Sequence, residues 1–186
     1  MRPDHITEIV NRVSGVNIQR GNGQEHLTSI RSPVLTGGAG AGSFLFLEDG
    51  IPLRAAGFAN VNGLFEVNYE QAGGIEVVRG PGSALYGSNA VHGLINVLSR
   101  APSLDLEREI DLSIGPHDLY QMKGTVSDTI GQHGYRLSVN GTTDGGYVSD
   151  SGYDQQKVSF RHDYYGDIDS FKTLFSHTNL NQETAG

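Results

Sequence analysis

Two glycine-rich segments are the first candidates for chemistry, because glycine loops can hold phosphate groups against backbone N–H groups. Gly38-Ala39-Gly40-Ala41-Gly42 precedes an apolar segment instead of following one, and its spacing is not that of a dinucleotide-binding loop. Gly82 to Gly87 has the outer glycines of a phosphate loop, but Ser88 and Asn89 stand where Lys and Ser or Thr are required. We therefore expect no nucleotide site.

The titratable side chains form no pattern that is typical of catalysis or metal binding. No two histidines have metal-ligand spacing on a predicted helix, so we expect them at exposed or turn positions. Glu48 and Asp49 are adjacent, and consecutive strand residues point to opposite faces, which disfavours an acid–base pair. The chain has no cysteine and no G-x-S-x-G sequence. We expect no catalytic residue, metal ion or cofactor, and therefore no enzyme. The histidines are His5, His26, His92, His117, His133, His162 and His177.

Composition divides the 186 residues into two parts. Residues 1–100 carry 7 basic and 8 acidic side chains, whereas residues 101–186 carry 6 and 13, within a total net charge of -8. An acidic chain disfavours nucleic-acid binding, which needs clustered Lys and Arg. Glycine is abundant, at 26 residues, which is typical of a chain rich in turns and strands. We predict one domain over 1–100 and a second over 101–186.

The first part reads as a small α/β domain. Apolar residues from Ile6 to Val13 recur at helical spacing, with Asp4 as a cap and Gly15 as the stop. Asp49-Gly50 between apolar segments predicts a tight hairpin, and Pro52 places the returning strand at an edge. A weak helical stretch is expected over 64–71 and a short helical piece within 83–89. The predicted strands are 16–18, 28–31, 44–47, 75–79 and 94–98.

The second part alternates between apolar and polar residues from Glu107 onward. Five strands are predicted, over Ile110 to Ile114, Tyr120 to Val126, Tyr135 to Val139, Val158 to Tyr164 and Phe171 to Phe175. This alternation is typical of transmembrane barrel strands, although a soluble antiparallel sheet alternates in the same way. Tight turns near 131–134 and 166–167 and a long connection over 142–152 favour the membrane barrel. The short connection at 115–118 fits that rule less well.

The segment over residues 75–100, IEVVRGPGSALYGSNAVHGLINVLSR, closely resembles the end of the plug domain in TonB-dependent outer-membrane receptors. Three upstream segments follow in the family's order: Ser14-Gly15-Val16, Ile30-Arg31 and Leu47 to Leu53. Two departures are Ser32-Pro33, where the family usually has glycine after arginine, and Gly73-Gly74, where a basic residue is common. The departures concern loop shape and ligand class rather than the family.

The resemblance implies an α+β plug domain with a small mixed sheet, followed by antiparallel strands of an incomplete transmembrane β-barrel. It implies energy-coupled uptake of a scarce nutrient across the bacterial outer membrane. A ferric siderophore or another metal chelate is the expected ligand, and cobalamin, haem and oligosaccharides are the other ligands of the family. The implied partners are the TonB complex, the nutrient and outer-membrane lipid, and no nucleic acid. We expect a piece of a longer receptor that lacks the signal peptide and the TonB-contacting segment. A stand-alone, plug-like, β-rich periplasmic interaction module is the alternative.

The resemblance also assigns residues. Arg31 and Arg79 match positions whose arginines pair with glutamates on the barrel wall as a lock, while the alternative is two solvated arginines at strand ends. The ligand would contact loops at the top of the plug, at Gly37, Gly38, Gly40, Gly42, Ala56, Phe58 and Asn60. The residues expected to maintain the plug motifs are Asp49, Gly50, Gly80, Pro81, Tyr86, Gly87, Gly93 and Asn96.

Overall fold

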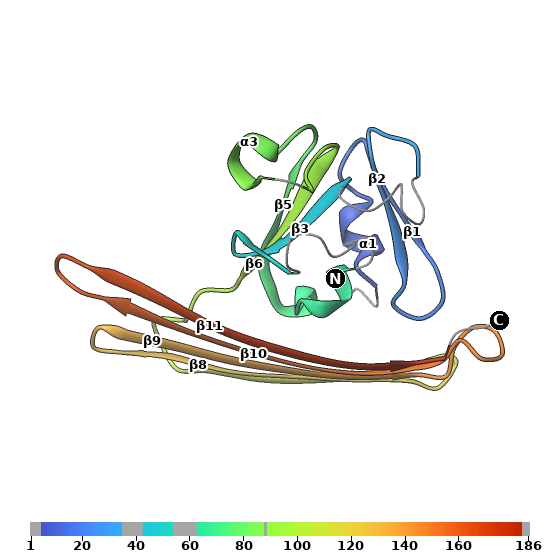
Figure 1. Ribbon diagram of the computed structural model, residues 1–186. Helices are drawn as coiled ribbons and strands as arrows, with labels where there is room; N and C mark the ends of the chain where they lie inside the picture. The colour runs from blue at the N-terminus through green and yellow to red at the C-terminus, as the bar shows by residue number, and fades with distance from the viewer. Residues whose placement is uncertain (1–4, 35–42, 54–62, 88, 184–186) are drawn as a thin grey trace. The chain divides into compact units, whose positions relative to one another are not determined.

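The computed structural model describes residues 5–34, 43–53, 63–87 and 89–183, and the chain forms two compact units, Met1–Ser99 and Arg100–Gly186 (Figure 1). Each unit is built around its own sheets. Among the described residues, no helix is long and apolar enough to cross a membrane.

The first unit begins with a helix that is shorter than the sequence predicts. Helix α1 is a single turn, Thr7–Val10, with Ile6 at its N-cap position; the expected cap, Asp4, lies outside the described residues. Isolated short helices are marginal in water, so packing of the apolar face must hold this turn. The side chain of Asn11 helps, because it bonds both the carbonyl and the amide of Ile18, at 2.9 and 2.6 Å.

Two sheets follow α1 in the first unit. Strand β1 (Val16–Arg20) pairs antiparallel with β2 (His26–Ile30). The second sheet has the order β4-β3-β6-β5, in which β3 and β6 are parallel and the other pairs are antiparallel. The family resemblance implied this mixed sheet. Its strands are β3 (Phe44–Glu48), β4 (Ile51–Pro52), β5 (Ala72–Val78) and β6 (Gly93–Ser99).

Most strands and short helices of this unit lie where the sequence predicts them. Phe44 to Leu47 are buried, and β4 with Pro52 lies at the sheet edge, as predicted. The stretch predicted as weakly helical forms two 3-10 turns, η1 (Gly63–Glu66) and η2 (Tyr69–Gln71), and Ser83–Tyr86 forms the short helix α3.

Two histidines correct the sequence-based prediction. His5 and His26 are buried rather than exposed, with their rings 6.1 Å apart, and His26 lies 5.9 Å from the ring of Phe46. The sequence around each histidine does not predict its burial, because the rings that contact them come from distant parts of the chain: Phe46 for His26, and His26 for His5. They lie beside an apolar core formed by α1, β1, β2 and the central strands.

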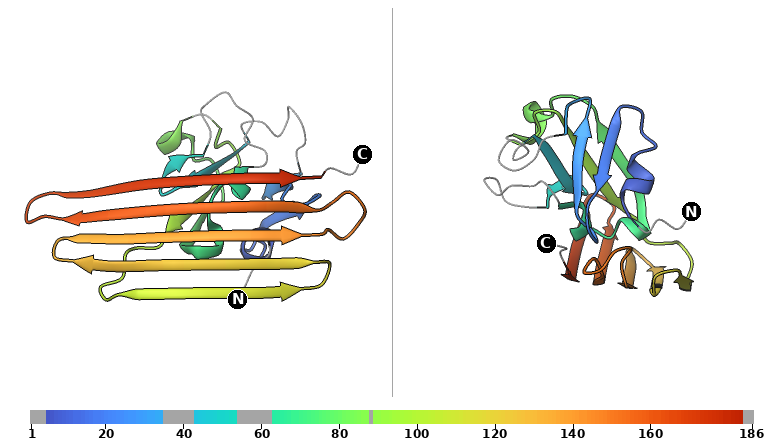
Figure 2. Two further views of the ribbon diagram at one scale, coloured as in Figure 1. Left: turned by 90° about the horizontal axis from the view of Figure 1, so that it is seen from below. Right: turned by 90° about the vertical axis from the view of Figure 1, so that its right-hand side faces the viewer.

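The second unit is one antiparallel sheet of five strands in the order β11-β10-β9-β8-β7, lying side by side in Figure 2. The described residues leave the sheet open, since β7 and β11 each pair on one side. As the alternation predicted, apolar side chains share one face, which is exposed: Ile110, Leu112, Leu137 and Phe175 are examples. The strands are β7 (Glu107–Gly115), β8 (Leu119–Ile130), β9 (His133–Asp144), β10 (Tyr153–Tyr165) and β11 (Ser170–Gln182).

Candidate functional sites in the plug-like unit and the sheet

The predicted ligand-contacting loops fall outside the description. Gly37, Gly38, Gly40 and Gly42 lie within residues 35–42, and Ala56, Phe58 and Asn60 lie within 54–62, both of which are outside the described residues. Their assignment stays a prediction.

Arg31 and Arg79, which are far apart in the sequence, meet the same turn. Arg31 directly follows β2 with a φ of 50°, and its amide donates to the carbonyl of Gly15 at 2.9 Å. The guanidinium of Arg79, just after β5, donates to the carbonyl of Ser14 at 2.8 Å. Both arginines are exposed. The turn therefore brings together three of the four motifs that carried the family resemblance, and the lock itself stays a prediction.

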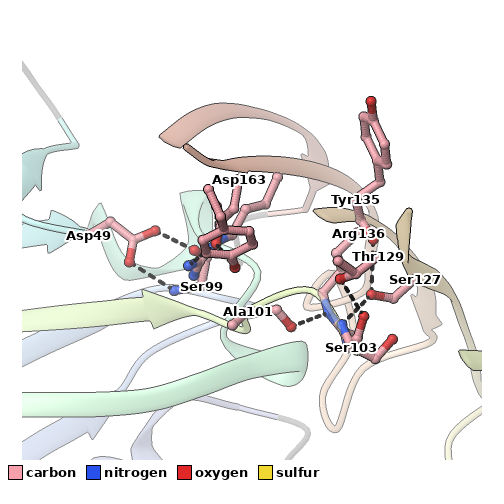
Figure 3. A network of polar contacts seen from close by, with 11 residues as sticks. Asp49, Ser99, Ala101, Ser103, Ser127, Thr129, Tyr135, Arg136 and Asp163 are labelled. Carbon is pink, nitrogen blue, oxygen red and sulfur yellow. Dashed lines mark hydrogen bonds and ion pairs between the residues drawn. The ribbon is translucent and has the colours of Figure 1, made fainter. Parts of the chain in front are cut away.

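Asp49 and Asn96 fasten the hairpin to the end of β6. Asp49 and Gly50 have φ of 49° and 83°, the left-handed values that a two-residue hairpin needs. The Asp49 carboxylate accepts hydrogen bonds from the amide and hydroxyl of Ser99 (Figure 3). Asn96 accepts the Gly50 amide at 2.9 Å and donates to the Glu76 carboxylate at 3.0 Å. Three strands are thus tied by side chains whose partners lie 20 to 50 residues away in the sequence.

The remaining motif residues surround the turn between β5 and β6. Gly80 and Gly87 have φ of 151° and 75°, and Tyr86 is exposed at the end of α3. Gly93 allows the closest approach: a Cβ there would lie 2.6 Å from the carbonyl oxygen of Val78. No side chain fits at Gly93 unless β5 and β6 move apart.

In the second unit, a group of side chains on the face opposite the exposed apolar one binds the segment that precedes β7. We call this group the linker clasp; it consists of Ser127, Thr129 and Arg136 on β8 and β9. The hydroxyl of Ser127 accepts the amide of Ser103 at 2.9 Å, and Thr129 donates to the carbonyl of the same residue at 2.7 Å (Figure 3). Arg136 donates to the carbonyl of Ala101 at 2.9 Å.

The Arg136 guanidinium also binds Glu107 at 2.6 Å, and Glu107 lies 3.4 Å from Arg100. Three backbone groups of residues 101–103 are therefore bound by side chains, much as a neighbouring strand would bind them. Sequence reasoning missed the clasp. The only available signal was a run of polar residues on the inward face, and alternation alone does not tell which of them has a chain segment to bind.

His26 has the clearest electrostatic perturbation in the first unit. Burial lowers the pKa of its imidazole from 6.5 to about 4, because the charged form loses its hydration. A hydrogen bond between Nδ1 and the Gln24 carbonyl, at 3.2 Å, opposes this effect in part. His26 is therefore neutral at pH 7.

The described residues hold no group of three or more His, Cys, Asp or Glu side chains that could bind a metal ion. The contacts described above position backbone and strands, and none of them aligns a nucleophile with a base.

Comparison with known proteins decides the family. The family model described as the TonB-dependent receptor plug domain matches residues 2–94. The chain belongs to this family. The resemblance drawn from the four motifs is confirmed, and relatives that are transporters and receptors also confirm the prediction that this is not an enzyme.

Curated relatives extend the similarity beyond the plug. The chain is 32% identical over 111 residues to the vitamin B12 transporter BtuB of Vibrio vulnificus, covering 59% of this chain and 17% of that protein. It is 28% identical over 168 residues to BtuB of Vibrio cholerae serotype O1, covering 90% of this chain and 26% of that protein. The chain thus spans about a quarter or less of the length of these relatives.

Solved structures share the fold. The ferric-catecholate import receptor Fiu from E. coli K12 matches with a TM-score of 0.71 and 21% identity, covering 95% of this chain and 24% of that one. The copper transporter OprC matches with a TM-score of 0.76 and 14% identity, covering 97% and 28%. Both matches span the two units, so the predicted fold, a plug followed by strands of a barrel that is not closed, is confirmed.

Proposed function

We propose that this chain contributes the plug and the first barrel strands to a receptor that takes up a metal chelate across the bacterial outer membrane. In this proposal residues 1–100 form the plug and residues 101–186 form the strands. The observation that carries it is the plug-family match over residues 2–94 followed directly by a sheet with an exposed apolar face.

The names of the similar proteins support a chemical class of ligand. Vitamin B12 and ferric catecholate are metal chelates, and copper is a metal ion. A chelate of a transition metal, either a ferric siderophore or a cobalt corrinoid, is therefore the proposed substrate. The metal is cargo here and requires no protein ligands in the plug.

The plug would act as a gate. It needs no covalent step, only two arrangements that differ in free energy, with the energy-transducing TonB complex favouring the open one. Strands held by exposed or partly exposed hydrogen bonds, such as the Arg79–Ser14 contact, are suited to such a change because each is worth only about 1 kcal/mol.

Uptake measured in the bacterium that encodes the chain tests this proposal. Deletion of the gene should abolish energy-dependent accumulation of either labelled cobalamin or a labelled ferric siderophore, and the gene supplied in trans should restore it. Deletion of tonB should reproduce the loss. Unchanged uptake of both ligands would contradict the proposed function and favour the stand-alone interaction module.

A further inference from the structure

Four aromatic side chains form one cluster in the second unit, at the start of β9 and the end of β10. His133 is paired across the two strands with Tyr164, and Tyr135 is paired with His162. Residues two apart along a strand share a face, so all four rings lie on the same face of the sheet. We call this group the ring cluster. Within it the two histidines stand diagonally opposite each other.

The rings of the cluster pack against one another. The imidazoles of His133 and His162 are stacked, with their centroids 5.3 Å apart and their planes 9° apart. Tyr135 stacks on His162 at 4.8 Å, and Tyr164 packs against His133 at 5.1 Å. Each imidazole is therefore supported by a tyrosine ring from the other strand. This packing sets the spacing of the two histidines before any ligand arrives, which reduces the ordering cost of binding one.

The two imidazoles bring a pair of nitrogen atoms together. Nδ1 of His133 lies 3.1 Å from Nε2 of His162, a distance at which one ring nitrogen donates its hydrogen to the other. When each neutral ring carries its hydrogen on the remote nitrogen, both of these nitrogens have a free lone pair. No proton has to leave the pair for this change of tautomer. The pair can then act as two ligands instead of a donor and an acceptor.

The spacing of the two nitrogens fits a single metal ion. Two nitrogens 3.1 Å apart, each about 2.0–2.1 Å from an ion, subtend an angle of about 100° at that ion. This value lies between the angles of about 90° and about 109° that square-planar and tetrahedral coordination require. The imidazoles must turn to direct both lone pairs at the ion. They have room to do so, because His133 is exposed and His162 is only half-buried.

The chemistry of the cluster favours a particular class of ion. Imidazole suits Cu²⁺, Ni²⁺ and Zn²⁺, whereas Mg²⁺ and Ca²⁺ prefer oxygen ligands. Asp128 on β8 is paired with Tyr135, so its negative charge lies on the same face as the cluster. The described residues supply no set of three or more His, Cys, Asp or Glu ligands, so water would fill the remaining positions around an ion.

We propose that His133 and His162 form a two-histidine site for a divalent transition-metal ion, with Cu²⁺ bound most tightly. The site belongs to the sheet and does not depend on the proposed uptake of a chelate. It departs from the expectation drawn from the sequence, which considered histidine pairs on helices. These two histidines are 29 residues apart, and only the pairing of β9 with β10 brings them together.

Titration of the untagged full chain with Cu²⁺, in detergent micelles at pH 7.5, tests the site. Isothermal titration calorimetry gives the affinity, and electron paramagnetic resonance counts the nitrogen ligands of the bound ion. The variants are His133→Gln, His162→Gln and the double variant. His177→Gln is the matched control, because His177 is exposed on the same face of the sheet and is paired with Val158. Far-UV circular dichroism checks that each variant keeps its β-structure.

We expect one tightly bound Cu²⁺ with two nitrogen ligands, weaker binding of Ni²⁺ and Zn²⁺, and no binding of Mg²⁺. Loss of a group that only supports a metal ligand costs roughly 10- to 100-fold in affinity, so each single variant, which loses a ligand, should lose at least as much. The double variant should bind no more weakly than either single variant, since one histidine alone cannot chelate. His177→Gln should bind as the original chain does.

Three results would overturn the site. They are an unchanged affinity in both single variants, an equal loss in His177→Gln, and a bound Cu²⁺ with one nitrogen ligand. If a glutamine variant loses its β-structure, His133→Phe and His162→Phe replace it, because phenylalanine keeps the stacked ring and removes the ligand nitrogen. The same expected and contrary results apply to them.

Discussion

Acidification should weaken the first unit through His26. This imidazole is buried between the ring of His5 and that of Phe46, and its pKa falls from 6.5 to about 4 because burial removes water from the charged form. The unfolded state therefore binds more protons than the folded state between these two pH values. Stability from neutral His26 is fully present above pH 6.5 and is lost as the pH falls toward 4.

The magnitude follows from the two pKa values. A difference of about 2.5 in pKa, at about 1.4 kcal/mol for each unit, gives a maximum loss of roughly 3 kcal/mol. About 1 kcal/mol is lost by pH 5.5, and most of the remainder is lost by pH 4.5. Because folded domains are stable by only about 5–15 kcal/mol, such a loss is readily measured.

Hydrogen exchange with mass spectrometry, corrected for the intrinsic pH dependence of exchange, reports the opening free energy of β2 and β6 in the full chain. His26→Gln should remove most of the dependence between pH 7 and pH 4.5, whereas His92→Gln, at a half-buried position, should keep it. The comparison uses the slope with pH, so a general destabilisation by either substitution does not matter. A slope that is unchanged in His26→Gln would refute the reasoning.

Three further predictions concern contacts in the two units. Gly93→Ala places a Cβ 2.6 Å from the Val78 carbonyl oxygen and should lower the stability of the first unit by about 1–3 kcal/mol, measured by hydrogen exchange at β5 and β6. Gly74→Ala is the control and should lower stability much less, because its Cβ has room. Arg136→Met removes the hydrogen bonds to Ala101 and Glu107 and should lower the free energy of opening the linker clasp by about 2 kcal/mol. Hydrogen exchange of the backbone amides within residues 101–106 should then be about 30-fold faster. Arg108→Met is the control, and an equal effect of the two substitutions would contradict the clasp. Arg79→Ala should cost this chain less than about 1 kcal/mol, since one exposed hydrogen bond is lost. If the lock exists, the same substitution raises the leak current of a full receptor in planar bilayers, and a cost to stability that is the same in both proteins would rule the lock out.

The sequence by itself determined the local structure and the family. Asp49-Gly50 could be assigned to a hairpin because the required left-handed φ angles depend on the two residues themselves. The outward apolar residues of β7 to β11 could be assigned to one face because side chains alternate along any strand. Four motifs in a fixed order identified the plug family, since a match to a family requires only the order of residues.

The tertiary structure alone decided which distant residues meet. His5 and His26 are buried by residues that are distant in the sequence. The carbonyls of Ser14 and Gly15 accept hydrogen bonds from Arg79 and Arg31. The clasp binds residues that precede β7. No periodicity encodes these contacts, because they depend on how whole strands pair. The sheet of the second unit is the clearest case. Each strand shows its own apolar stretch in the sequence, but the angle between the stretches exists only once register fixes how far each strand is shifted against the next.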